Sequence, residues 1–146
     1  MNLRRHPLFR LLLRLDLPTT DYVVFGSGPL LAYGLRDGIG DLDIVARNRA
    51  WNICCTVQPP RPAPSGLGQM IRLHQGALEV VNQWLSPEFE TDRLIADSRL
   101  VDGIPFASLR DVVASKWLTN RPKDHVDLAR IAATHSSLFS LVGGSR

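Results

Sequence analysis

The sequence is poor in cysteine and has no long apolar run. Its 146 residues include two cysteines, Cys54 and Cys55, which are neighbours in the chain. Adjacent cysteines rarely form a disulfide bond, so the pair indicates a reducing compartment and predicts a cytoplasmic protein. We interpret both as small apolar core residues rather than as zinc ligands. No stretch approaches the roughly 20 apolar residues that a membrane span needs, so no membrane segment is predicted.

Charge of either sign is also modest. Charged residues make up 21% of the chain and apolar residues 45%, with a formal net charge of +3. These values are ordinary for a soluble globular protein, and the length suits one compact domain over residues 1–146. The small positive balance is compatible with an anionic ligand, such as a nucleotide or a nucleic acid, and equally with ordinary surface charge.

Helical and strand patterns alternate along the chain. Helices are predicted over residues 6–15, 29–35, 49–57, 87–96, 109–118 and 121–133, and strands over residues 21–25, 41–46, 70–73 and 78–84. A hairpin is predicted over residues 99–106 with its turn at Asp102-Gly103, and residues from Ser136 onward are predicted to fray. Residues 58–66 contain four prolines, so they are predicted to form an exposed loop rather than a helix or an inner strand.

The most informative stretch is residues 21–47, DYVVFGSGPLLAYGLRDGIGDLDIVAR. A β-type run leads into the turn Gly26-Ser27-Gly28, an apolar helix follows, and a second β-type run carries Asp41 and Asp43. Because side chains alternate along a strand, these two carboxylates are predicted to point the same way. At about 4 Å and an effective dielectric of about 20 they would repel by roughly 4 kcal/mol. A divalent cation removes that cost, and paired carboxylates suit Mg²⁺.

The order of strand, Gly-Ser turn, helix and Asp-x-Asp strand resembles the nucleotidyltransferase superfamily with the DNA polymerase β-like fold. Residues 102–131, DGIPFASLRDVVASKWLTNRPKDHVDLARI, are similar to the segment that closes many small bacterial nucleotidyltransferase-like proteins. The two resemblances leave the first helix and the proline-rich loop unmatched. They imply an α/β (α+β) fold, with a small mixed β-sheet and helices packed mainly on one face.

The resemblance implies a set of metal-holding carboxylates. Asp41 and Asp43 would bind Mg²⁺ or Mn²⁺, and Glu79 would complete the set and take the proton from the attacking hydroxyl. The family usually has Asp at this third position, and Glu is longer by one methylene. The alternative for Glu79 is an outward-facing side chain on a half-exposed strand.

The resemblance also implies contacts to the triphosphate of an NTP. Gly26, Ser27 and Gly28 would cradle it, since glycines permit close approach and a helix N-terminus favours phosphate. Basic candidates for phosphate contacts are Arg36, Lys116 and Lys123. The alternatives are a plain strand-to-helix turn and ordinary surface charges. Asp124 and Asp127 are predicted to cap the last helix and to pair with Arg or Lys.

The activity that the resemblance implies is transfer of a nucleoside monophosphate from an NTP to an acceptor, with release of pyrophosphate. The acceptor could be a small molecule, RNA or a protein, and the chain has no room for a separate nucleic-acid-binding domain. Two other classes stay open. One is a catalytically weak relative that acts through a partner protein, for example in a toxin–antitoxin-type pair. The other is an ordinary α/β domain in which Asp-x-Asp is a coincidence.

Overall fold

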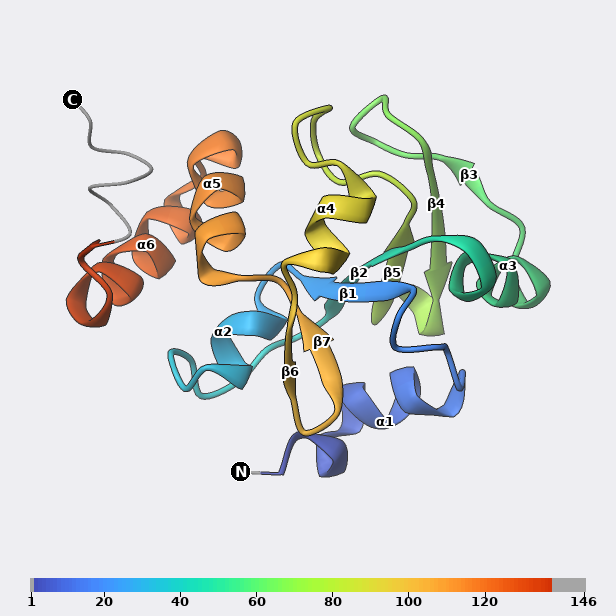
Figure 1. The fold of residues 1–146 in the computed structure, drawn as a ribbon, viewed down its shortest axis with the longest axis horizontal. Coiled ribbons are helices and arrows are strands. Elements are labelled where there is room, and N and C mark those ends of the chain that lie inside the picture. The colour runs from blue at the N-terminus through green and yellow to red at the C-terminus, as the bar shows by residue number, and fades with distance from the viewer. Residues whose placement is uncertain (1, 138–146) are drawn as a thin grey trace. The chain divides into compact units, whose positions relative to one another are not determined.

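The computed structural model describes residues 2–137, which divide into two compact units (Figure 1). The first unit ends at Ala107 and the second begins at Ser108. The first contains the sheet and the second two helices. The single domain predicted from the length stays a prediction.

The first unit alternates short helices and strands. In chain order its elements are η1 Leu3–Arg5, α1 Pro7–Arg14, β1 Tyr22–Phe25, α2 Gly28–Ala32, β2 Leu42–Ala46, α3 Asn48–Val57, β3 Arg61–Pro62, β4 Gln69–Leu73, η2 His74–Gly76, β5 Leu78–Val81, α4 Thr91–Ala96, β6 Arg99–Val101 and β7 Ile104–Phe106. Within the described residues the strands form one seven-stranded sheet in the order β3-β4-β5-β2-β1-β7-β6. β2 is parallel to β5, β1 is parallel to β7, and the other neighbours are antiparallel. The mixed sheet confirms the predicted α/β class.

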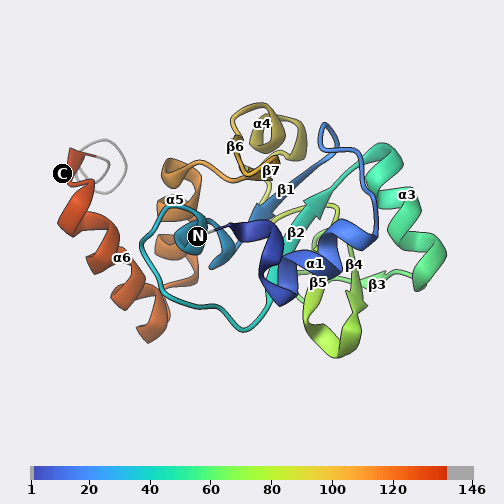
Figure 2. The same ribbon diagram turned by 90° about the horizontal axis from the view of Figure 1, so that it is seen from below.

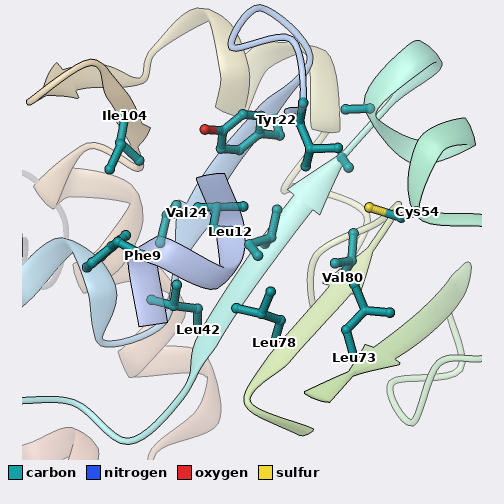
Figure 3. Packing of buried hydrophobic residues seen from close by; sticks show 14 of the residues in the cluster. Phe9, Leu12, Tyr22, Val24, Leu42, Cys54, Leu73, Leu78, Val80 and Ile104 are labelled. Atoms are coloured by element: carbon teal, nitrogen blue, oxygen red, sulfur yellow. The ribbon is translucent and has the colours of Figure 1, made fainter. Parts of the chain in front are cut away.

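The main core lies on one face of this sheet (Figure 3). Phe9 and Leu12 of α1 pack there with Leu42 of β2 and Leu78 of β5, and Cys54 of α3 closes one end of the cluster. α1 crosses β5, and α3 lies along β4 (Figure 2). Leu31 of α2 belongs to the same cluster, so three helices cover this face, as predicted.

The opposite face is covered only in part. α4 contacts β1 from the side opposite to α1 (Figure 1). Phe25 of β1 stacks on Trp84 with ring centroids 4.7 Å apart, and Phe89 meets Phe25 edge-on at 6.4 Å. Trp84 is therefore a packing residue. The rest of this face, over β2, β5 and β4, carries the charged Asp43, Glu79 and Arg72 together with the apolar Val45, Val81 and Met70.

Local sequence rules hold at several element ends. Pro7 opens α1, where its missing N–H group costs no hydrogen bond. Asp102 and Gly103 both have positive φ, 52° and 78°, as a two-residue hairpin turn requires. In the second unit the Ser108 hydroxyl accepts a 3.2 Å hydrogen bond from the backbone N–H of Asp111, which caps α5.

Other element ends differ from the prediction. α4 begins at Thr91 rather than at residue 87, and α2 ends at Ala32 rather than at residue 35. Asn48 is the first residue of α3 and not its cap, and its φ is 49°. The proline-rich segment contains β3, which pairs with β4 at the edge of the sheet. Pro62 fits an edge strand because a strand there needs hydrogen-bond donors on one side only.

The second unit contains α5 Leu109–Thr119 and α6 Pro122–Thr134. Apolar periodicity in the sequence places Trp117 and Val126 on the apolar faces of these helices, which is wrong, because they are 46% and 53% exposed. The buried set includes Lys116 and Asp127 instead. The tail predicted to fray lies mostly outside the described residues. No helix over residues 2–137 is both long and apolar enough to cross a membrane.

Candidate active site on the open face of the sheet

Strand register aligns three charged residues on the open face of the first unit's sheet. Asp43 of β2 is the register partner of Glu79 in β5, and Glu79 is the partner of Arg72 in β4. Register partners on neighbouring strands point to the same face. We call Arg72, Glu79 and Asp43 the carboxylate row. On the other side of Asp43 the row meets Phe25, its partner in β1.

The Gly-Ser turn lies directly against Asp43. Gly26 has φ of 67°, and a Cβ atom built there would lie 2.3 Å from Oδ2 of Asp43. A larger residue would have to displace the carboxylate and would also be strained in this backbone conformation. Gly26 and Asp43 are therefore neighbours in the fold, and that they belong to one functional site stays a prediction.

Glu79 is held by Arg72 rather than pointing freely outward. Nε of Arg72 lies 3.1 Å from Oε2 of Glu79, and the two side chains are 65% and 30% exposed. The Arg72 guanidinium also lies against Gly76, where a Cβ atom would approach Nη2 to 2.4 Å. An ion pair this exposed is worth at most about 1 kcal/mol, so a ligand can compete for either partner at small cost.

Asp41 is placed differently from Asp43. β2 begins at Leu42, so Asp41 precedes the strand and is exposed, whereas Asp43 lies within the strand and is half-buried. Among residues 2–137 no group of three or more His, Cys, Asp or Glu side chains is arranged to hold a metal ion. Asp41, Asp43 and Glu79 thus do not form a metal-binding group of three carboxylates. The sheet places only Asp43 and Glu79 next to each other.

The donor set can still be compared with what Mg²⁺ requires. Mg²⁺ is usually held by one or two carboxylates together with substrate phosphates and water, rather than by an all-protein cage. Asp43 and Asp41, two residues before it, provide the one or two carboxylates that Mg²⁺ requires. Glu79 meets it only when it leaves Arg72. The residues present therefore fit a cation that arrives with a phosphate ligand.

The turn also gathers a basic side chain. Nη1 of Arg36 donates a 2.8 Å hydrogen bond to the Ser27 hydroxyl. Ser27 does not cap α2 with its side chain, although its carbonyl accepts from the N–H groups of Leu30 and Leu31. Gly28 has a packing reason to be glycine, because a Cβ atom there would lie 2.6 Å from Cγ1 of Val24. Of the predicted phosphate contacts, Gly26, Ser27 and Arg36 are thus adjacent to Asp43 or to the same turn.

The two candidate lysines belong to the second unit and have different surroundings. The side chain of Lys116 is 7% exposed, and its Nζ lies 3.0 Å from Oδ2 of Asp127 and 3.7 Å from Oδ1 of Asp124. Its charge is matched by those two carboxylates, which is a structural role. Lys123 is exposed at the start of α6. We call Lys116, Asp124 and Asp127 the buried ion cluster.

Asp124 is the most strongly held member of this cluster. It accepts hydrogen bonds from the Thr119 hydroxyl at 2.6 Å, from the Arg121 backbone N–H at 2.9 Å and from Arg121 Nε at 2.8 Å. Burial acts to raise the pKa of Asp124, but the hydrogen bonds from Arg121 and Thr119 outweigh it and hold the pKa well below its usual range. The predicted capping and pairing of Asp124 and the pairing of Asp127 are confirmed.

Arg72 is the residue of this site that sequence reasoning missed. Its signal was present in the two neighbouring predicted strands, residues 70–73 and 78–84, which a short connection joins. If Leu73 pairs with Leu78, as it does, then Arg72 must face Glu79. The sequence-based prediction considered Glu79 alone and did not consider its partner on the neighbouring strand. Arg47 lies outside the site: it binds the Thr20 carbonyl, Asp21 and Asp92.

Comparison of this chain with protein-family models, with curated proteins and with solved structures found no match.

Proposed function

We propose that the protein is a metal-dependent nucleotidyltransferase that moves a nucleoside monophosphate from an NTP to an acceptor and releases pyrophosphate. One observation carries the proposal. Asp43 lies between the Gly26 turn, which its carboxylate touches, and Glu79, its register partner on the next strand. A glycine-rich turn that touches one of two adjacent carboxylates suits a phosphate–Mg²⁺ complex.

Each residue has a defined task in this proposal. Asp41 and Asp43 hold Mg²⁺ or Mn²⁺, and Gly26 and Ser27 bind phosphate oxygens through their backbone N–H groups. Arg36, already at the Ser27 hydroxyl, adds a positive charge beside them. Glu79 accepts the proton of the acceptor hydroxyl after it leaves Arg72. The bound cation would supply charge stabilisation on the transferred phosphoryl group and on the leaving pyrophosphate.

A second candidate is a relative that binds nucleotide without transferring it and acts through a partner protein, as in a toxin–antitoxin-type pair. The Arg72–Glu79 ion pair favours it, because it neutralises the residue expected to act as base. The lack of a three-carboxylate group over residues 2–137 favours it as well. Both candidates require Asp43 for metal-dependent nucleotide binding. They differ in whether the nucleoside monophosphate is transferred to an acceptor.

The test is incubation with each α-labelled NTP and Mg²⁺ or Mn²⁺, with bulk cellular RNA, protein and small molecules as acceptors. Wild type is compared with Asp41→Asn, Asp43→Asn and the control Asp16→Asn, an exposed aspartate outside the site. Label transfer and pyrophosphate release that vanish in the first two variants and persist in the control support the enzyme. Metal-dependent NTP binding with the same pattern but no transfer supports the second candidate. Absence of both binding and transfer refutes both.

A further inference from the structure

A groove lies at the β3–β4 edge of the sheet. Its volume is about 430 Å³, within the range of small-molecule sites. It is lined by Gln58, Pro59, Arg61, Pro62, Pro64, Met70 and Arg72. We call this the β3–β4 groove. It contains none of the residues expected from the sequence to act in the site.

Part of the groove lining lies on the same face of the sheet as the carboxylate row. Arg61 is the register partner of Met70, and Arg72 is the partner of Glu79. Met70 and Arg72 are two residues apart on β4, so they share a face. Arg61, Met70 and Arg72 therefore lie on the face that carries Glu79 and Asp43. Arg72 belongs to both features, since it lines the groove and pairs with Glu79.

The lining has a clear charge character. Two of its residues, Arg61 and Arg72, are cationic and none is acidic. They are diagonal neighbours on paired strands, a position about 7–8 Å apart at the backbone. Two long guanidinium side chains at that spacing can converge on one oxyanion. A dianion would balance both charges, and a phosphate monoester carries about −1.5 to −2 at neutral pH.

The remaining walls are apolar and stiff. Three prolines and Met70 provide surface for an apolar body next to the two arginines. Proline has one fixed backbone dihedral, so this wall loses little conformational freedom when a ligand binds. The groove therefore combines an anionic anchor point with a preformed apolar wall.

We propose that the β3–β4 groove binds a small phosphate monoester with an apolar body, and that this molecule carries the hydroxyl group that attacks the NTP. The second half of this statement rests on the proposed transferase function, because it uses the position of the groove beside Glu79. The first half concerns binding alone. It holds or fails whether or not the protein transfers nucleotide.

Arg72 links ligand binding to the carboxylate row. A phosphate that takes the Arg72 guanidinium competes with Glu79, whose carboxylate lies 3.1 Å away. Occupation of the groove thus frees Glu79 from its ion pair. Conversely, removal of the Glu79 charge strengthens phosphate binding, since a like charge beside the ligand is lost.

The first experiment is isothermal titration calorimetry of the full chain with phenyl phosphate, with phenol and benzoate as matched probes. Phenol has the aromatic body without the charge, and benzoate has a single charge on a carboxylate. We expect phenyl phosphate to bind at least about tenfold more tightly than either, a difference that one extra charged contact supplies. Its affinity should rise between pH 5.5 and 7.5 as the phosphate loses its second proton, with a pKa of about 6.

The second experiment uses four variants in the same titration. Arg61→Gln and Arg72→Gln should each weaken phenyl phosphate binding about tenfold or more. Glu79→Gln should strengthen it several-fold. The matched control is Arg99→Gln, an exposed arginine on β6 at the opposite edge of the sheet, which should leave the affinity unchanged. Circular dichroism of each variant checks that it is folded.

Three results would overturn the proposal. They are no phenyl phosphate binding at millimolar concentration, equal binding of benzoate, and binding that Arg99→Gln weakens as much as Arg61→Gln does. If phenyl phosphate binds but no nucleotidyl transfer is detected, the proposed transferase activity is refuted and the proposed ligand of the groove is retained. Transfer that depends on Asp43 but is indifferent to Arg61 and to added phenyl phosphate refutes the acceptor role of the groove.

Discussion

Two groups of carboxylates in this protein have the same composition and different surroundings. The carboxylate row in the first unit consists of an arginine and two acidic residues, and the buried ion cluster in the second unit consists of a lysine and two acidic residues. In the row, Arg72 and Glu79 are 65% and 30% exposed. In the cluster, Lys116, Asp124 and Asp127 are 7%, 0% and 5% exposed.

Burial decides what each group can do. Charges removed from water must be matched in place, and removing one partner leaves the others unpaired at high cost. The buried ion cluster is therefore committed to the folded structure. The exposed pair of the row loses little when its partners separate, because water replaces the lost contact. Only the row can exchange protein partners for a ligand.

The largest expected effect is on the buried ion cluster. Replacing Lys116 by Met keeps the length of the side chain and removes the charge, which leaves Asp124 and Asp127 short of a cation. We expect a loss of about 3–5 kcal/mol in the free energy of unfolding, measured by urea titration with circular dichroism. Lys123→Met, an exposed lysine on the same unit, is the control and should change stability by less than about 0.5 kcal/mol. If Lys116→Met and Lys123→Met both change the free energy of unfolding by equally small amounts, the buried ion cluster does not differ from the carboxylate row in its contribution to stability.

The next effect concerns pH. The pKa of Asp124 in the folded protein lies below its ordinary value of about 3.9. Its ionised form therefore stabilises the fold fully above about pH 4, and this stabilisation is lost as the pH falls toward the folded-state pKa. Asp124→Asn should cost about 2–3 kcal/mol at pH 7. The difference from wild type should be constant from pH 5 to 7 and shrink below pH 4. A difference that grows on acidification would contradict the assigned direction.

A smaller effect is expected where the row meets the Gly-Ser turn. Gly26→Ala places a methyl group in the space of the Asp43 carboxylate and in a backbone conformation with φ of 67°. We expect a loss of about 1–2 kcal/mol from strain and a loss of metal-dependent NTP binding. Gly38→Ala is a suitable control, because a Cβ atom there meets nothing within 4 Å. Unchanged NTP binding in Gly26→Ala would separate the turn from the site.

The smallest effect on stability is expected within the row itself. Arg72→Gln breaks an ion pair that is largely exposed, so the free energy of unfolding should change by less than about 1 kcal/mol. The same variant should nonetheless change ligand binding, which is the property that separates the row from the buried ion cluster. A loss above about 2 kcal/mol in a urea titration would show that the pair is structural.

Much of the local structure was readable from the sequence. Ser108 ahead of an apolar run predicted a helix start, Asp102-Gly103 predicted a hairpin turn, and Pro7 predicted the first turn of α1. Each of these rules depends on a few neighbouring residues and on backbone conformations that only certain side chains favour. The alternation of strands and helices also predicted the mixed α/β class.

The sequence-based predictions failed where contacts between segments far apart in the chain determine which residues are buried. Trp117 and Val126 were expected on buried faces and are exposed, while the charged Lys116 and Asp127 are buried. Periodicity alone could not show this, because a buried charge is stable only when it is paired, and the partner of Lys116 lies on the other helix. Lys116 on α5 and Asp127 on α6 satisfy one another, and neither helix by itself contains that information.

By itself, the sequence determined several element ends, such as those at Pro7, Ser108 and the Asp102-Gly103 turn, and that two carboxylates follow a glycine-rich turn. The tertiary structure alone decided the strand order and register, and thus that Glu79 is adjacent to Asp43 and paired with Arg72. It also decided that Arg61 of the proline-rich edge strand faces the same way as these residues. The physical reason is that strand pairing joins segments far apart in the chain, and a shift of one residue would turn each side chain to the other face.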